Sequence, residues 1–538
     1  MTRRFLLFVA LLAIFVGACQ PGPPAGEPTA RASAAPSLAT ASASASAPPA
    51  PFVSKERFQL LIADATIVDG TGAKPVVGDV LVQAGRIAHV GEVAEQVQVD
   101  RRIDGRGLVV APGFIDAHSH GEPLRDNQHL LMQGVTTIVI GQDGLSPSNE
   151  RMAVWVARTK SRSLAINVVP LVGHGSVRIL ANVGASKDPG PERIAKMKKL
   201  VEEELAAGAW GLSTALEYEP GTFAGADELA ALAEPVARID GIVMSHMRSE
   251  DDDKIAQSLD ELIAQGERSG ARVHVAHVKI VHGKGQAVAD ELLARMQAAR
   301  KRGLRLTADA YPYTASYTSI GIVFPEFAKP PNDFDEAKQN RRQELVAYLR
   351  QRVTKRGGPG AILFGTPPYR GSTLAQVAAE KGQPYEEVLL DLGPLGSSAA
   401  FFVMDEVTQD RLLLDKHVMI GADGSPGSGH PRAYGTFARL LRLYVVKHKR
   451  LSIEEAVRKM TGLAAETVGL TRQKRGLLRA GWAADLVVFD PQRIEDPADY
   501  KSPNEMARGM RWVLINGRAV IDDGRFDRNV QAGALLLR

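Results

Sequence analysis

Cysteine is almost absent from this sequence, since only Cys19 occurs among 538 residues. One cysteine excludes an internal disulfide, so the stability of the fold must come from its core and its packing. An excess of one charge is lacking too, because 65 Lys and Arg nearly balance 61 Asp and Glu, for a net charge of +4. No basic run is interleaved with aromatic residues. The composition therefore indicates no nucleic-acid partner.

The apolar stretch at the N-terminus, Phe5 to Val16, is too short to span a bilayer comfortably. It follows the positively charged start Met1-Thr2-Arg3-Arg4, which is the pattern of a secretory signal peptide. The next residues, Val16-Gly17-Ala18-Cys19, resemble the bacterial lipobox, in which the cysteine is lipidated and becomes the mature N-terminus. We therefore predict a signal peptide over residues 1–19 and a lipid on Cys19. The alternative is an accidental cysteine in an ordinary cleavable signal.

This leader predicts an exported bacterial lipoprotein, anchored to a membrane of the cell envelope in the periplasm or on the cell surface. Residues 20–57 consist largely of Ala, Ser, Pro, Thr and Gly, a composition that buries too little apolar surface to fold. We expect a disordered tether there, and membrane contact only through the N-terminal lipid.

Two β-rich segments flank the rest of the chain. Residues 58–111 contain short apolar runs separated by turn residues, and residues 471–538 have the same character. We expect the two segments to pair into one small β-sandwich.

Between these segments, eight apolar runs alternate with helix-like stretches. The runs are Gly113 to Ala117, Thr136 to Ile140, Ala165 to Leu171, Gly211 to Leu216, Gly241 to Ser245, Arg272 to Ala276, Leu304 to Ala308 and Val418 to Ala422. This α/β alternation predicts a parallel (β/α)8 (TIM) barrel over residues 112–470, with its active site at the C-terminal ends of the strands. The long connection before the last strand, about 319–417, predicts an inserted subdomain, which is either a lid or a peripheral addition.

Ligand-type side chains follow several of these runs. His118 and His120 are two residues apart, so in a strand they face the same side. Other candidates end later strands: Asp143, His246, His277 and Asp423. Imidazole and carboxylate suit Zn2+, and a zinc site with an open position activates water as a nucleophile. The sequence therefore predicts a zinc hydrolase with one or two ions.

Several motifs resemble one family. They are Ala111-Pro112-Gly113-Phe114-Ile115-Asp116-Ala117-His118-Ser119-His120, Gly211-Leu212-Ser213-Thr214, Ser245-His246-Met247-Arg248-Ser249-Glu250 and Asp309-Ala310-Tyr311-Pro312-Tyr313. Together they resemble the amidohydrolase superfamily, specifically its D-aminoacylase (N-acyl-D-amino-acid deacylase) branch, from about residue 58 to about 525. The resemblance implies a zinc-dependent hydrolase that cleaves N-acyl-D-amino acids to a carboxylate and a D-amino acid.

The resemblance also implies roles for single residues. His118 and His120 would belong to one metal position and His246 and His277 to the other, with Asp423 as the catalytic acid and base. One departure concerns Asp143, which stands where the family has a metal-binding cysteine; a carboxylate can also ligate or bridge zinc.

A receptor for the substrate α-carboxylate is implied as well. It would consist of Lys279, Tyr311 and Arg432, with Tyr313 as an alternative to Tyr311. A guanidinium or ammonium beside a phenol is chemically suited to a carboxylate.

Other readings stay open at this point. N-acylated amino acids include D-residue and isoaspartyl dipeptides, so a dipeptidase is an alternative. A cyclic amidohydrolase is disfavoured, because such enzymes usually carry a carboxylated lysine on the fourth strand and Trp210 to Leu216 contains none. The non-enzyme alternative is a ligand-binding lipoprotein on a lapsed amidohydrolase fold.

Overall fold

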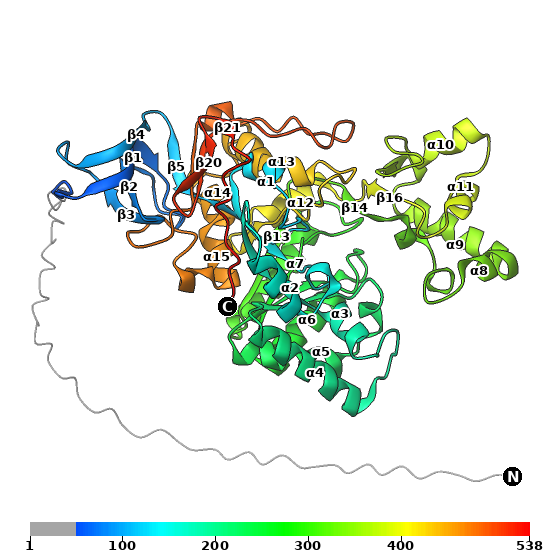
Figure 1. The fold of residues 1–538 in the computed structure, drawn as a ribbon. Helices are drawn as coiled ribbons and strands as arrows, with labels where there is room; N and C mark the ends of the chain where they lie inside the picture. The colour runs from blue at the N-terminus through cyan, green and yellow to red at the C-terminus, as the bar shows by residue number, and fades with distance from the viewer. Residues whose placement is uncertain (1–49) are drawn as a thin grey trace, which may run out of the picture. The chain divides into compact units, whose positions relative to one another are not determined.

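The computed structural model describes residues 50–538, whose arrangement is shown in Figure 1. The predicted signal peptide, the predicted lipid on Cys19 and most of the predicted tether lie outside these residues. Within the described range, no helix combines the length and the apolar character needed to cross a membrane.

A barrel of parallel strands forms the centre of the molecule. Its strands are β6 (Phe114–Asp116), β7 (Val135–Ile140), β8 (Asn167–Pro170), β9 (Val172–Gly173), β10 (Gly211–Ala215), β11 (Ile242–His246), β12 (Arg272–Val275), β13 (Leu306–Ala310) and β17 (Val418–Ile420). β8 and β9 are two halves of the third predicted strand, and neighbouring strands pair in parallel. A parallel bridge between Ser119 and Gly424 joins the first strand to the last. The eight predicted strands therefore follow one another round a TIM barrel.

Helices cover the outside of this barrel (Figure 1). They include α4 (Gly190–Ala206), α5 (Ala226–Arg238), α6 (Ile255–Ser269), α7 (Gln286–Lys301) and α12 (Glu406–Leu413). α6 shows why such segments pack on the strands, because Leu259, Leu262 and Ile263 recur at helical spacing and are buried. Strands such as β7 and β11 are buried along their whole length, as parallel strands between a core and a helix layer must be.

Both β-rich segments of the chain contribute to one nine-stranded sheet. Its strands are β1 (Arg57–Ile67), β2 (Val76–Gln83), β3 (Arg86–Gly91), β4 (Gln98–Asp104), β5 (Val109–Pro112), β18 (Leu486–Phe489), β19 (Met510–Ile515), β20 (Arg518–Asp522) and β21 (Arg525–Phe526). The two segments meet where β5 pairs with β1 on one side and with β18 on the other. The last residues of the chain then run along the barrel, where Trp210 donates a hydrogen bond to the carbonyl of Leu536 at 2.8 Å.

The insertion between β13 and β17 has its own core. It contains β14 (Ser316–Ser319), α8 (Phe334–Asn340), α9 (Arg342–Lys355), β15 (Ile362–Phe364), α10 (Leu374–Lys381), α11 (Tyr385–Leu392) and β16 (Ser398–Phe401). The three strands form a separate antiparallel sheet, and buried side chains such as Leu345, Leu349 and Val353 pack beneath it. The helical stretch from Glu336 to Lys355 is divided at Arg341, whose backbone (φ −127°, ψ 26°) leaves the helical region. Figure 1 shows this subdomain apart from the barrel helices.

Candidate active site

Six predicted ligand-type side chains gather at the C-terminal ends of five barrel strands. His118 and His120 follow β6, Asp143 follows β7, and His246 ends β11. His277 lies two residues beyond β12, and Asp423 lies three residues beyond β17. These residues are His118, His120, Asp143, His246, His277 and Asp423. All except the fully buried His118 line one cavity of about 160 Å³.

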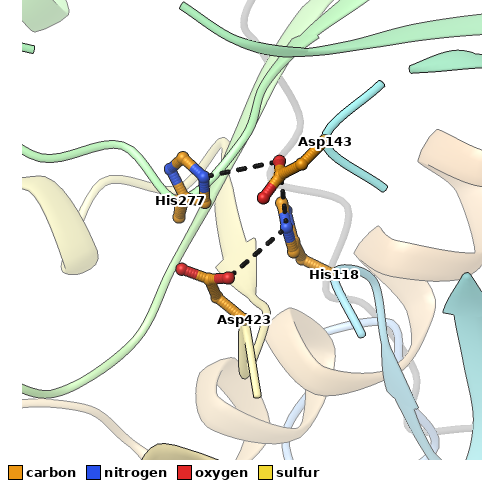
Figure 2. A group of neighbouring side chains, drawn as sticks. All are labelled: His118, Asp143, His277 and Asp423. Carbon is orange, nitrogen blue, oxygen red and sulfur yellow. Dashed lines mark ion pairs between the residues drawn. The ribbon is translucent and has the colours of Figure 1, made fainter. Parts of the chain in front are cut away.

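Asp143 lies at the centre of this group. Its carboxylate is 3.5 Å from Nε2 of His118 and 3.3 Å from Nε2 of His120. The oxygen that faces His118, Oδ1, is also 3.9 Å from Nδ1 of His246 and 3.7 Å from Nε2 of His277. Figure 2 shows the pairs that His118 and His277 make with it. The residue at the family's cysteine position thus contacts the histidines of both predicted metal positions.

Three of these residues have a backbone conformation that L-residues seldom adopt. Asp143 has φ 51°, His277 has φ 34° and Asp423 has φ 50°. Left-handed backbone at a non-glycine residue costs free energy and is concentrated at functional sites. Here it turns each side chain back from its strand end into the group.

Two carboxylates fix the orientation of the imidazoles. Glu217 is 3.1 Å from Nε2 of His246, which leaves Nδ1 to face Nε2 of His277 at 2.9 Å and Asp143 at 3.9 Å. Glu250 is 3.2 Å from Nδ1 of His277, which leaves Nε2 facing Asp143. Such carboxylate–histidine pairs usually support metal-binding imidazoles.

Asp309, in β13, likewise contacts two imidazoles, those of His118 and His274. Its Oδ2 is 3.8 Å from Nδ1 of His118 and accepts from Nε2 of His274 at 2.7 Å. Its Oδ1 accepts the backbone N–H of His277 at 3.0 Å. Gly421 is required beside it, because an added Cβ would lie 2.6 Å from this carboxylate and 2.9 Å from Cβ of His118.

The donor set fits a zinc ion. Tetrahedral zinc with bonds of about 2.0–2.2 Å separates neighbouring ligand atoms by about 3.3–3.6 Å. Four of these side chains bring ligand atoms within 4.8 Å of one another: His118, Asp143, His277 and Asp423. Among the described residues, Nε2 of His118 and Oδ1 of Asp143 are buried without a hydrogen-bond partner. Buried polar atoms of this kind are costly unless a ligand satisfies them.

Asp423 has a different environment from Asp143. Its Oδ1 is 3.3 Å from Nε2 of His120, and its Oδ2 pairs with Arg432 at 2.6 Å. Burial opposes the charge of Asp423, but Arg432 and then His277 hold the pKa of its carboxyl well below the usual range. Asp423 is therefore a carboxylate at neutral pH, available to accept a proton.

The three residues of the predicted carboxylate receptor lie near one another, but two of them have partners. Nζ of Lys279 is 2.6 Å from Oε1 of Glu250. Burial lowers the pKa of this lysine, but the charge of Glu250 raises it, and the net effect is a raised pKa. The guanidinium of Arg432 lies 5.0 Å from the ring centre of Tyr311, whose buried hydroxyl has no partner among the described residues. The alternative residue, Tyr313, lines a separate cavity with Arg439.

The insertion forms the opposite wall of the catalytic cavity. Ser316, Tyr317, Thr318, Ile322 and Arg356 line it together with the barrel residues. A larger cavity of about 770 Å³ continues outward past Ile322 and the barrel residue Tyr218. The structure brings the predicted strand-end residues together. The sequence alone gave no role to Glu217, Glu250, Asp309 and Arg356, whose contacts join distant segments.

Comparisons with known proteins agree with this architecture. A family profile described as "Amidohydrolase family" matches residues 369–521. The N-acyl-D-aspartate deacylase of Alcaligenes xylosoxydans xylosoxydans is 33% identical over 497 residues, which cover 86% of this chain and 92% of that protein.

Two solved structures cover nearly the same part of the chain. The N-acyl-D-glutamate deacylase of Bordetella bronchiseptica, complexed with zinc and a phosphonate that mimics the tetrahedral intermediate, is 30% identical, with a TM-score of 0.74 over 90% of this chain and 100% of that one. A D-aminoacylase with a binuclear metal centre is 31% identical, with a TM-score of 0.75 over 89% and 100%.

Proposed function

Because the chain belongs to the D-aminoacylase (N-acyl-D-amino-acid deacylase) family of amidohydrolases, we propose that it hydrolyses the amide bond of N-acyl-D-amino acids. The products are a carboxylate and a free D-amino acid. The observation that carries the proposal is the group of imidazoles and carboxylates around Asp143, supported from behind by Glu217, Glu250 and Asp309.

Zinc is the cofactor that this donor set takes. The residues that would hold it are two pairs of histidines and one carboxylate: His118, His120, His246, His277 and Asp143. When bound, zinc polarises the amide carbonyl and lowers the pKa of water. Asp143 faces both pairs, so the site holds one ion or two without the cysteine of the family pattern.

Asp423 moves the proton of the reaction. Its Oδ1 faces the imidazole of His120, where the attacking water approaches, and its ionised state lets it accept the water proton. The same oxygen then returns the proton to the leaving nitrogen, which becomes the amine of the product. Arg432 holds the other carboxylate oxygen and so keeps Oδ1 oriented.

Lys279, Tyr311 and Arg432 receive the α-carboxylate of the substrate. The buried hydroxyl of Tyr311 is a donor with no described partner, and the cations of Lys279 and Arg432 lie on the cavity wall. Since both cations already have carboxylate partners, the substrate shares them with Glu250 and Asp423.

Two measurements on protein made without residues 1–19 test the proposal together. Elemental analysis gives the zinc content, and an amine assay follows release from matched N-acetyl-D- and N-acetyl-L-amino acids. We expect zinc and release from the D series. Zinc without release from either series would refute the proposed substrate class while leaving the metal site intact.

We also propose, from the sequence alone, that the protein is exported and anchored to a cell-envelope membrane by a lipid on Cys19. The motif Val16-Gly17-Ala18-Cys19 after a short apolar run supports this proposal. Cys19→Ser should move the protein from the membrane fraction to the soluble fraction on centrifugation, whereas Ser44→Ala in the tether should not. Membrane association that survives Cys19→Ser would refute the anchor.

A further inference from the structure

Arg356 is a cation buried in the wall of the catalytic cavity. It directly follows α9, so the insertion rather than the barrel supplies it. Only 2% of its surface is exposed, yet it lines the same cavity as His246, His277 and Asp423. Its guanidinium lies 5.2 Å from the ring centre of Phe401, a residue of the insertion core.

This guanidinium lacks close partners. Nε is buried without a hydrogen-bond partner among residues 50–538, and Nη1 comes no nearer than 3.9 Å to Oδ1 of Asp251. Asp251 is already used, because it pairs with Arg352 at 2.5 Å and lies 3.5 Å from Lys355. One carboxylate therefore serves three cations at the end of α9.

The neighbouring barrel carboxylate is also engaged, since Glu217 pairs with His246. Burial and the charge of Arg352 lower the pKa of Arg356, with weaker opposing effects from Glu217 and Asp251. Arginine remains charged in proteins and offers five N–H donors in a planar fork. A buried arginine without a close acceptor is costly, so the arrangement favours an anion that enters the cavity.

The position of Arg356 distinguishes it from the predicted α-carboxylate receptor. Arg432 lies beside Asp423 and Tyr311, at the ends of β17 and β13. The carboxylates and the phenol whose charges act on Arg356 belong instead to Glu217, Asp251 and Tyr218, beyond the ends of β10 and β11. The cavity is thus lined by Lys279 and Arg432 from the barrel and by Arg356 from the insertion.

We propose that Arg356 binds the side-chain carboxylate of an acidic substrate, so that the enzyme selects N-acyl-D-aspartate or N-acyl-D-glutamate over neutral N-acyl-D-amino acids. This inference rests on the proposed function and specifies its substrate class. The substrate's α-carboxylate meets Arg432, its scissile amide lies at the metal-type group, and its second carboxylate reaches the fork of Arg356. A bidentate pair there satisfies the donors that the protein leaves open.

The test compares acidic and neutral substrates in Arg356→Met, which keeps the apolar stem and removes the fork. We expect wild-type kcat/KM for N-acetyl-D-glutamate or N-acetyl-D-aspartate to exceed that for N-acetyl-D-methionine. In Arg356→Met the acidic substrates should lose about 10- to 100-fold, the value of a charged hydrogen-bonded pair, while N-acetyl-D-methionine changes little. Arg370→Met, at an exposed arginine of the same subdomain, is the matched control and should match the wild type.

Two outcomes would overturn the inference. Equal losses for acidic and neutral substrates would assign Arg356 to the α-carboxylate or to the fold, and a wild-type preference for N-acetyl-D-methionine would remove the acidic subsite altogether.

Binding measurements distinguish a failure of this inference from a failure of the proposed reaction. Calorimetry on zinc-loaded Asp423→Asn should show binding of N-acetyl-D-glutamate that the further change Arg356→Met weakens. If the wild type releases no amino acid but this dependence on Arg356 is found, the proposed reaction fails and the carboxylate subsite stands. If Arg356→Met leaves that binding unchanged, the subsite fails.

Discussion

The two walls of the catalytic cavity hold their charges differently. On the barrel wall, Asp423, Glu250 and Asp309 each lie against a cation or an imidazole. On the insertion wall, Arg356 has no close acceptor. The barrel side is thus organised before the substrate arrives, whereas the insertion side offers a charge that the substrate must match. We therefore expect turnover to depend on the first arrangement and the choice of substrate on the second.

The two walls also belong to different cores. The strand ends rise from the large core shared by the barrel and its helices, and the insertion packs around a separate set of residues. Changes in the barrel wall should therefore affect turnover and metal affinity, and changes in the insertion should affect stability of that subdomain and choice of substrate. The following predictions are ordered from the largest expected effect to the smallest.

Asp423→Asn should remove the proton carrier from the barrel wall and leave the metal ligands in place. Loss of a positioned general base costs typically about 10²–10⁴-fold in turnover. We expect kcat to fall by that amount while zinc content stays at the wild-type value by elemental analysis. Turnover close to that of the wild type would show that another group carries the proton.

Leu349→Ala tests whether the insertion core is independent. Leu349 is fully buried in that core, and such truncations cost about 2–5 kcal/mol of unfolding free energy. We expect a lower melting temperature with unchanged zinc content. Leu395→Ala, at a leucine that is 76% exposed in the same subdomain, should leave the melting temperature alone. Loss of zinc in Leu349→Ala would mean that the two walls fold as one unit.

Lys459 is a fully buried cation that, like Arg356, has no carboxylate nearer than 3.9 Å, and its titration should affect stability. Its Nζ donates to the carbonyl of Val418 at 2.8 Å and to that of Asp415, and burial lowers its pKa to about 8 from 10.5. Below pH 8 the lysine is charged in both states, so folding must bury the charge. Between pH 8 and 10.5 the folded state has lost this proton and the unfolded state has not, so the free energy of unfolding rises with pH.

Urea denaturation at pH 7.5 and pH 10 measures this dependence. We expect the wild type to gain up to about 3 kcal/mol relative to Lys459→Met over that range. Parallel pH dependences for the two proteins would show that Lys459 titrates as it does in the unfolded chain.

Glu217→Gln should lower the zinc affinity of the site, because it removes a charge and leaves the shape of the side chain almost unchanged. Glu217 orients His246, and loss of such a partner typically costs about 10–100-fold in metal affinity. Competition with a chelator measures the zinc affinity. Glu219→Gln is a matched control, because Glu219 makes no hydrogen bond to His246. Similar affinities for both variants would show that His246 needs no carboxylate behind it.

Much of the barrel could be predicted from the sequence because its signals are local. Each strand is a short apolar run that ends in polar residues, and the parallel pairing brings those ends together. The ligand group could be predicted for the same reason, since His118, His246 and Asp423 each lie at or just beyond such an end. The family resemblance, which the comparisons confirm, added the chemistry.

The remainder depends on contacts that no local pattern encodes. β4 has no apolar pattern that would mark it as a strand, because only Ile103 of its residues is buried and Asp100 to Arg102 are all charged. Glu217 and Glu250 look like ordinary loop carboxylates until the fold places them against histidines. Arg356 follows a charged helix end, Arg352 to Lys355, in a subdomain whose position over the strand ends is set by tertiary packing.

The order in which the polypeptide is made bears on how the nine-stranded sheet is completed. β5 pairs with β18, so residues near 110 must wait for residues near 487, and Trp210 must likewise wait for Leu536. Contacts between such distant positions form slowly, because the entropy of the long intervening chain is lost before the stabilising pairing is made. A chain synthesised only as far as the barrel strands can therefore form the middle of the fold, but β5 gains its second neighbour only when β18 has been made.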